Sequence, residues 1–150
     1  MERTMLTRRI YLWTARLFLA SVVVQVFLIG LYLFAAGNLD WHRVFALVPT
    51  VLSLVLLVAT FAARLPTGSK RWAALLFVAT FVQGALPSMK GGLPIVAALH
   101  PVNALPMLWL GIVVLRDAEE QARLVPAPTS EATSPTKDAT ASAEAPSTPS

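Results

Sequence analysis

Residues 10–36 read IYLWTARLFLASVVVQVFLIGLYLFAA, a run of 27 residues in which Arg16 carries the only charge. A helix needs roughly 17–25 apolar residues to cross the hydrocarbon core of a bilayer, so this run is long enough. Three further apolar blocks follow, at residues 44–63, 72–87 and 93–115. An open sheet would leave backbone polar groups unpaired in lipid, which favours helices. The sequence therefore predicts an all-α polytopic membrane protein, an up-down bundle of four transmembrane helices.

Capping and helix-breaking residues indicate where these helices begin and end. Either Asn38 or Asp40 is suited to cap the second helix, and Pro94 suits the first turn of the fourth. The fourth helix is expected to continue past Leu115 into water. The tail is rich in Pro, Ala, Ser and Thr, which cannot build a core, so it is predicted to be disordered. The predicted organisation is a basic N-terminus at 1–9, a transmembrane domain at 10–124 with spans at about 10–36, 40–64, 71–87 and 93–116, and a cytoplasmic tail at 125–150.

The positive charges are distributed unequally between the two ends of the predicted bundle. The formal net charge is +4, which by itself could suggest a nucleic-acid partner. Only Arg43 and Lys90 lie near the connections on the far side, whereas nine basic residues lie on the side of the termini: Arg3, Arg8, Arg9, Arg16, Arg64, Lys70, Arg71, Arg116 and Arg123. Basic residues concentrate on the cytoplasmic side of membrane proteins, so both termini are predicted to be cytoplasmic. The expected partners are the lipid bilayer and other membrane subunits or a second copy, and no nucleic acid.

The two histidines of the chain lie in similar short phrases. Residues 42–47 read HRVFAL and residues 100–105 read HPVNAL. A glutamine precedes each histidine by 17 residues, Gln25 before His42 and Gln83 before His100. Such a repeat of the rarest polar residues predicts a duplicated two-helix unit, which would place the histidines in equivalent positions.

Polar residues inside apolar spans mark packed faces or functional sites. Each span has one such face. The stripes are Thr14, Ser21, Gln25 and Tyr32 in the first span; His42, Ala46, Pro49, Ser53 and Thr60 in the second; Thr80, Gln83 and Gly84 in the third; and His100, Asn103, Met107 and Gly111 in the fourth. We predict that Gln25, Gln83, His100 and Asn103 form a polar cluster in the outer half of the core. Either Gln83 or Asn103 is expected to accept the N–H of the His100 ring.

Histidines on diagonal helices of a bundle can hold haem or a metal ion. His42 and His100 are therefore candidate axial ligands of haem b. An estimate of depth argues against a shared iron, because His42 lies roughly 33 Å and His100 roughly 22 Å above the predicted inner ends of their helices. The two would come level only if the fourth helix extends inward or the helices tilt and kink. The chain has no cysteine, which excludes thiolate ligands. No catalytic residues are predicted, since there is no nucleophilic triad, paired buried carboxylates or phosphate-binding loop.

The segment LHPVNAL at residues 99–105, together with the glutamine-bearing first span, resembles a family of small, uncharacterised four-helix bacterial membrane proteins. The resemblance covers about residues 10–116, with His100-Pro101-Val102-Asn103 as its signature. It implies a multi-pass protein of the bacterial cytoplasmic (inner) membrane and supplies no reaction. The histidine pair is also similar to the axial pairs of membrane b-type cytochromes and haem A synthases. Those proteins generally carry more histidines, and the acidic residue beside the histidine in the synthases is missing here.

Three functions remain open from the sequence. The favoured one is a non-enzymatic membrane protein, or an accessory subunit, in which the polar cluster fixes helix packing. The alternative is a redox protein that binds haem b or a metal through His100, with or without His42. A weaker alternative is a small-solute carrier.

Overall fold

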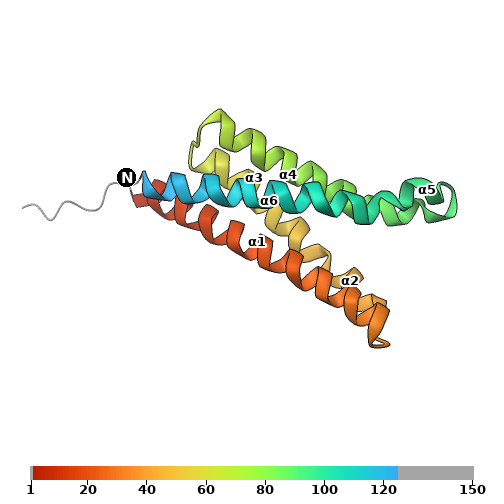
Figure 1. The fold of residues 1–150 in the computed structure, drawn as a ribbon. Helices are drawn as coiled ribbons and strands as arrows, with labels where there is room; N and C mark the ends of the chain where they lie inside the picture. The colour runs from red at the N-terminus through yellow and green to blue at the C-terminus, as the bar shows by residue number, and fades with distance from the viewer. Residues whose placement is uncertain (1, 125–150) are drawn as a thin grey trace, which may run out of the picture.

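The computed structural model describes residues 2–124, and every regular element in that part of the chain is helical. This confirms the all-α prediction. Four stretches are long and apolar enough to cross a membrane: Met5–Phe34, Leu39–Ala62, Thr67–Gly91 and Pro94–Arg123. The elements are α1 (Glu2–Phe34), α2 (Leu39–Phe45), α3 (Leu47–Ala62), α4 (Thr67–Ala85), the 3₁₀ helix η1 (Leu86–Gly91), α5 (Pro94–Ala97) and α6 (Leu99–Arg123) (Figure 1).

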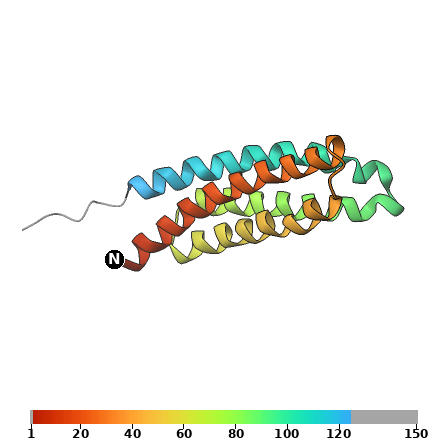
Figure 2. The same cartoon turned by 90° about the horizontal axis from the view of Figure 1, so that it is seen from below.

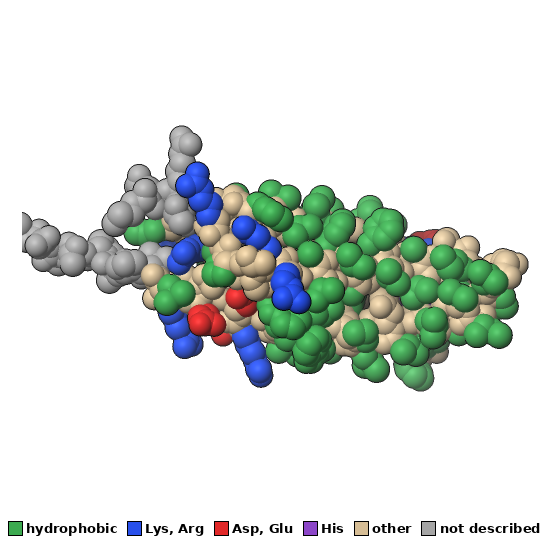
Figure 3. Space-filling view, turned by 90° about the horizontal axis from the view of Figure 1, so that it is seen from above, with side chains coloured by type: hydrophobic (Ala, Val, Ile, Leu, Met, Phe, Trp, Pro, Cys, Tyr) green, Lys and Arg blue, Asp and Glu red, His purple; other side chains and the backbone are tan. Residues whose placement is uncertain are grey.

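The four long helices form a closed ring of neighbours. Helix α1 packs against α3 and α6, and α4 packs against the same two helices, so α1 and α4 are diagonal to each other. The start of α1 and the end of α6 lie at the same end of the bundle in both views (Figures 1 and 2). We call this the basic end, because lysine and arginine side chains gather there, and we call the opposite end the outer end (Figure 3).

Two prolines explain why the second and fourth spans are each divided into two helices. A proline has no N–H and its ring clashes with the carbonyl four residues earlier. Pro49 acts on Phe45, the last residue of α2, and Pro101 acts on Ala97, the last residue of α5. Both interruptions fall within a few residues of a histidine, so each histidine lies beside a break in the regular α-helix.

The expected caps are confirmed. The Asn38 side chain accepts the backbone N–H of Asp40 at 2.7 Å, and Pro94 occupies the first turn of α5. At the basic end α3 closes with Arg64 in the left-handed region at φ 52°, and the Leu65 N–H donates to the Thr60 carbonyl at 2.9 Å. That six-residue bond is the Schellman arrangement, which turns the chain sharply toward α4.

The last turns of α6 differ from expectation. The helix does run past Leu115, to Arg123, but one face of these last turns is packed against the bundle and is not exposed to water. Ala118 is 0% exposed and Gln121 is 6% exposed, because they continue the buried face of α6 at helical spacing from Val114. Helix α1 begins at Glu2, so the basic N-terminal segment belongs to the first helix. The tail predicted at residues 125–150 lies outside the described part of the chain.

The outer surface between the ends is apolar. Large side chains such as Val23, Phe81 and Leu105 are each more than 60% exposed, and hydrophobic atoms cover most of the face shown beyond the basic end (Figure 3). A water-soluble bundle would bury such side chains, and contiguous apolar surface of this extent is typical of contact with lipid or other protein. The core itself is small and includes Tyr11, Phe18, Leu56, Leu76 and Val114.

Candidate functional site

Each half of the bundle is closed at the outer end by the same kind of hydrogen bond. In the first half, Nδ1 of His42 lies 3.2 Å from the backbone oxygen of Gln25; in the second, Nδ1 of His100 lies 2.9 Å from the backbone oxygen of Gln83. A carbonyl can only accept, so Nδ1 carries the proton in both bonds. The same atoms are therefore paired across the same separation of 17 residues in both halves.

The two rings also meet each other. Their centroids are 6.3 Å apart and the planes are inclined at 79°, an edge-to-face contact. The expected difference in depth is therefore wrong. It placed the inner end of the fourth helix at Leu115, whereas α6 continues to Arg123. Those eight further residues add about 12 Å of helix, which is close to the difference of about 11 Å expected between the depths of His42 and His100.

His100 belongs to a hydrogen-bonded network between α4 and α6. Its Nε2 lies 3.3 Å from Nε2 of the Gln83 amide, whose N–H donates when Nδ1 of the ring holds the proton. The Asn103 amide nitrogen donates to Oε1 of Gln83 at 2.8 Å and to the Ala79 carbonyl at 2.9 Å. Of the two expected acceptors of the ring N–H, Gln83 is the one that accepts it, and it does so with its backbone oxygen.

The first half has a less complete network than the second. Within residues 2–124, Nε2 of His42 has no hydrogen-bond partner, and the bond from its Nδ1 is the longer of the two. Oε1 of Gln25 is buried and also lacks a partner in this part of the chain. We refer to Gln25, His42, Gln83, His100 and Asn103 as the polar cluster; all five are partly buried.

Most of the predicted interior stripe is buried. Ser53 and Thr60 are 0% exposed, and these members of the stripes in the other spans are also buried: Thr14, Ser21, Thr80, Met107 and Gly111. Two members of the predicted stripes are not inside, since Tyr32 is 42% exposed and Gly84 also lies at the surface. Both lie near the outer ends of their helices, where fewer neighbours cover the face.

A second polar group, at the basic end, was not predicted from the sequence. Asp117 of α6 accepts the hydroxyl of Tyr11 from α1 at 3.0 Å and the hydroxyl of Ser69 from α4 at 2.9 Å. Tyr11 is 0% and Ser69 is 1% exposed. The available signal was the spacing Val114, Ala118, Gln121, which continues the buried face of α6 past the apolar block and brings Asp117 toward the core.

The ligand sets that the cluster could offer are limited. No group of three or more His, Cys, Asp or Glu side chains comes together among residues 2–124. A zinc site built only from protein ligands commonly needs four of them, so the cluster does not supply one. Two imidazoles suffice only for a centre that brings its other ligands with it, as haem does.

The comparisons with known proteins concern part of this site. Residues 25–89 match a family of unknown function (DUF6220). The matched segment holds three members of the polar cluster, Gln25, His42 and Gln83, and stops before the HPVN phrase at residues 100–103. No curated protein and no solved structure matches the chain. An uncharacterised family is thus the relationship that the matched segment supports.

Proposed function

We propose that the chain is a multi-pass integral membrane protein in which the polar cluster fixes the packing of the outer end and carries out no reaction of its own. The four long apolar helices and the exposed apolar side chains support insertion in a bilayer. Nine basic residues at one end against two at the other support cytoplasmic termini in a bacterial inner membrane. A role as an accessory subunit fits a chain in which Gln83, His100 and Asn103 bond to one another.

The observation that carries this proposal is the network around Gln83. The side-chain amide of Gln83 donates to Nε2 of His100 and accepts from Asn103, while the backbone oxygen of Gln83 accepts the N–H at Nδ1 of His100. Because these groups bind one another across α4 and α6, they hold two helices at a fixed register in a setting without water. The second copy of the Gln–His bond, in α1 and α2, supports an origin of the two halves by duplication.

A double-mutant cycle tests the packing role. The variants Gln83→Leu, Asn103→Leu and the double variant are unfolded reversibly in mixed micelles. Because the two amides share a bond, we expect a coupling free energy of about 0.6 kcal/mol, the average for interhelical polar pairs, and of no more than about 1.7 kcal/mol, their maximum. The control is the pair Asn103→Leu and Ser88→Ala, since Ser88 bonds only to the nearby Ala85 carbonyl. Additive effects in both cycles would reject the network as a packing device.

The second candidate function is binding of haem b between His42 and His100. The two rings that would hold this group have their centroids 6.3 Å apart. Ligating histidines also anchor their other ring nitrogen to a carbonyl or carboxylate, as both Nδ1 atoms do here. The Nε2 atoms would bind the iron, which requires that His100 leave the Gln83 amide. The bound group would supply one-electron chemistry; the chain would orient the two rings.

Absorption spectroscopy separates the two candidates. The full chain is purified in detergent, incubated with hemin and freed of excess cofactor. The packing role predicts no Soret band above that of the double variant His42→Ala/His100→Ala, because the network already occupies Nε2 of His100. A Soret band that requires both histidines would replace the packing role by the haem role. The solute-carrier alternative stays a prediction from the sequence.

A further inference from the structure

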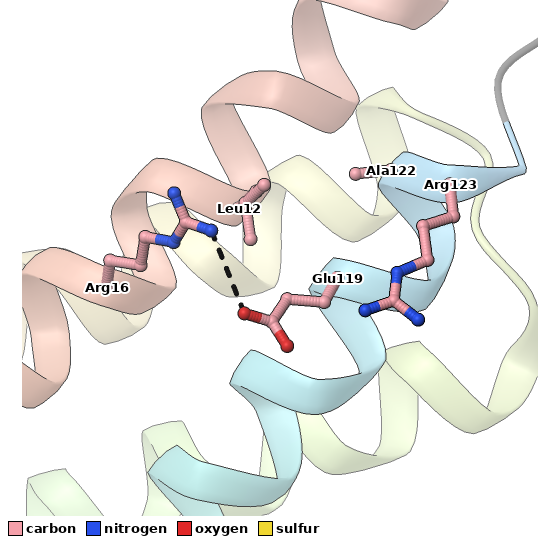
Figure 4. Close-up of a pocket in the computed structure, with 5 residues that line it drawn as sticks. All are labelled: Leu12, Arg16, Glu119, Ala122 and Arg123. Atoms are coloured by element: carbon pink, nitrogen blue, oxygen red, sulfur yellow. Dashed lines mark ion pairs between the residues drawn. The ribbon is translucent and has the colours of Figure 1, made fainter.

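A shallow pocket lies at the basic end between α1 and α6, away from the polar cluster. Its volume is about 290 Å³, and its lining is made of Leu12, Arg16, Glu119, Ala122 and Arg123. Figure 4 shows the Glu119 side chain between the two arginines, with Leu12 and Ala122 along one side. Pockets for small ligands are commonly about 300–1,000 Å³, so this one is suited to a small polar group rather than to a whole lipid.

The charges in this pocket do not cancel. Nη2 of Arg16 lies 3.7 Å from Oε1 of Glu119, and their side chains are 43% and 39% exposed. The side chain of Arg123 forms no hydrogen bond or ion pair with any residue from 2 to 124. Two arginines and one glutamate give the lining a formal charge of +1. A half-exposed ion pair is held weakly, so the Arg16 guanidinium can turn from Glu119 toward an incoming anion.

The position of the pocket identifies the source of such an anion. Arg16 lies over the ring of Trp13, with 5.0 Å between its Cζ and the ring centroid, and Trp13 is 59% exposed. Exposed tryptophans and arginines concentrate at the level of lipid headgroups. On the side away from the basic end, the exposed apolar residues Val23 of α1 and Ile112 of α6 offer a surface for acyl chains.

We propose that this pocket binds the phosphate of an anionic phospholipid. The phosphodiester lies between the guanidinium groups of Arg123 and Arg16, since arginine binds phosphate oxygens with paired N–H donors. One negative charge neutralises the formal charge of the lining, whereas a zwitterionic headgroup leaves it unbalanced. Basic pockets between helices on the cytoplasmic side are suited to such headgroups. The site is independent of the polar cluster and of the functions proposed for it.

Native mass spectrometry of the full chain in detergent tests this site. Phosphatidylglycerol, phosphatidylcholine and phosphatidylethanolamine are added in turn, and the fraction of protein that carries lipid is measured. We expect about fivefold weaker binding of phosphatidylglycerol after Arg123→Gln, because one arginine near a charged surface contributes about that factor. The matched control is Arg71→Gln, which removes the same charge at the basic end from α4, outside the pocket. Circular dichroism verifies that both variants keep their helices.

Three results would overturn the proposal. Equal weakening by Arg71→Gln and Arg123→Gln would mean that binding depends on general surface charge. Equal or stronger binding of phosphatidylcholine or phosphatidylethanolamine would mean that the pocket does not select an anionic headgroup. Displacement of phosphatidylglycerol by millimolar inorganic phosphate would assign the pocket to a free ion instead of a lipid.

Discussion

Replacing Gly111 with alanine is expected to destabilise the bundle by about 1–3 kcal/mol, the usual cost of adding atoms to a packed core. A Cβ at this position would lie 2.9 Å from Cδ2 of Leu19 and 2.9 Å from Cε1 of Phe18. The Phe18 ring is 0% exposed, so it cannot turn outward to make room. The Leu19 side chain and the Phe18 ring would have to shift at the contact between α1 and α6, which is one of the four main contacts of the ring.

The matched control is Gly30→Ala in α1, where an added Cβ meets nothing within 4 Å. Alanine favours a helix over glycine by up to about 1 kcal/mol, so this variant should be as stable as the parent or more stable. Reversible unfolding in mixed micelles measures both. Equal effects of the two substitutions would mean that α1 and α6 do not approach closely at Gly111.

The second large effect is expected at Asp117. Asp117→Ala should lower the free energy of unfolding by roughly 3 kcal/mol, because it leaves the buried hydroxyls of Tyr11 and Ser69 without their charged acceptor. Asp117→Asn should have an intermediate effect, since its carboxamide oxygen can still accept one hydroxyl. Glu120→Ala is the control on the same helix; Glu120 is exposed, and such substitutions usually change stability by less than about 0.5 kcal/mol.

A rescue variant strengthens this test. Apolar replacement of all partners in a buried hydrogen-bonded group is nearly neutral, whereas removal of one partner is costly. The triple variant Tyr11→Phe/Ser69→Ala/Asp117→Leu should therefore recover most of the stability that Asp117→Ala loses. If the triple variant is no more stable than Asp117→Ala, the three side chains do not form one buried group.

The sequence predicted the features that depend on local pattern. The long apolar blocks predicted the four long helices, and the period of the polar residues predicted buried positions such as Ser53 and Thr80. The caps at Asn38 and Pro94 also follow from residue type and position. Each of these depends on the chemistry of neighbouring residues along one helix, which is visible without knowledge of the fold.

The sequence did not predict the features that depend on the axial position of one packed helix relative to another. Whether His42 lies level with His100 depends on how far the packed part of α6 extends past Leu115, and the charged residues there favoured an early end of the membrane span, with the rest of the helix in water. The packing of Tyr11, Ser69 and Asp117 requires α1, α4 and α6 to meet at the same level of the bundle. Each of these residues, taken alone, is typical of a helix end that is exposed to solvent. The acceptor of the His100 N–H is a backbone oxygen, and a pattern of side chains in the sequence does not indicate which backbone oxygen a ring will meet.

Solid-state NMR on the chain in lipid bilayers, with only histidine labelled with ¹⁵N, most directly tests the proposal that equivalent Gln–His bonds bring two rings together. With only two histidines in the chain, each of the four ring nitrogens can be assigned by comparison with His42→Ala and His100→Ala. We expect protonated Nδ1 in both rings and a through-space ¹⁵N–¹⁵N correlation between them. Protonation at Nε2 with bare Nδ1 in either ring, or the absence of any correlation between the rings, would contradict the proposal.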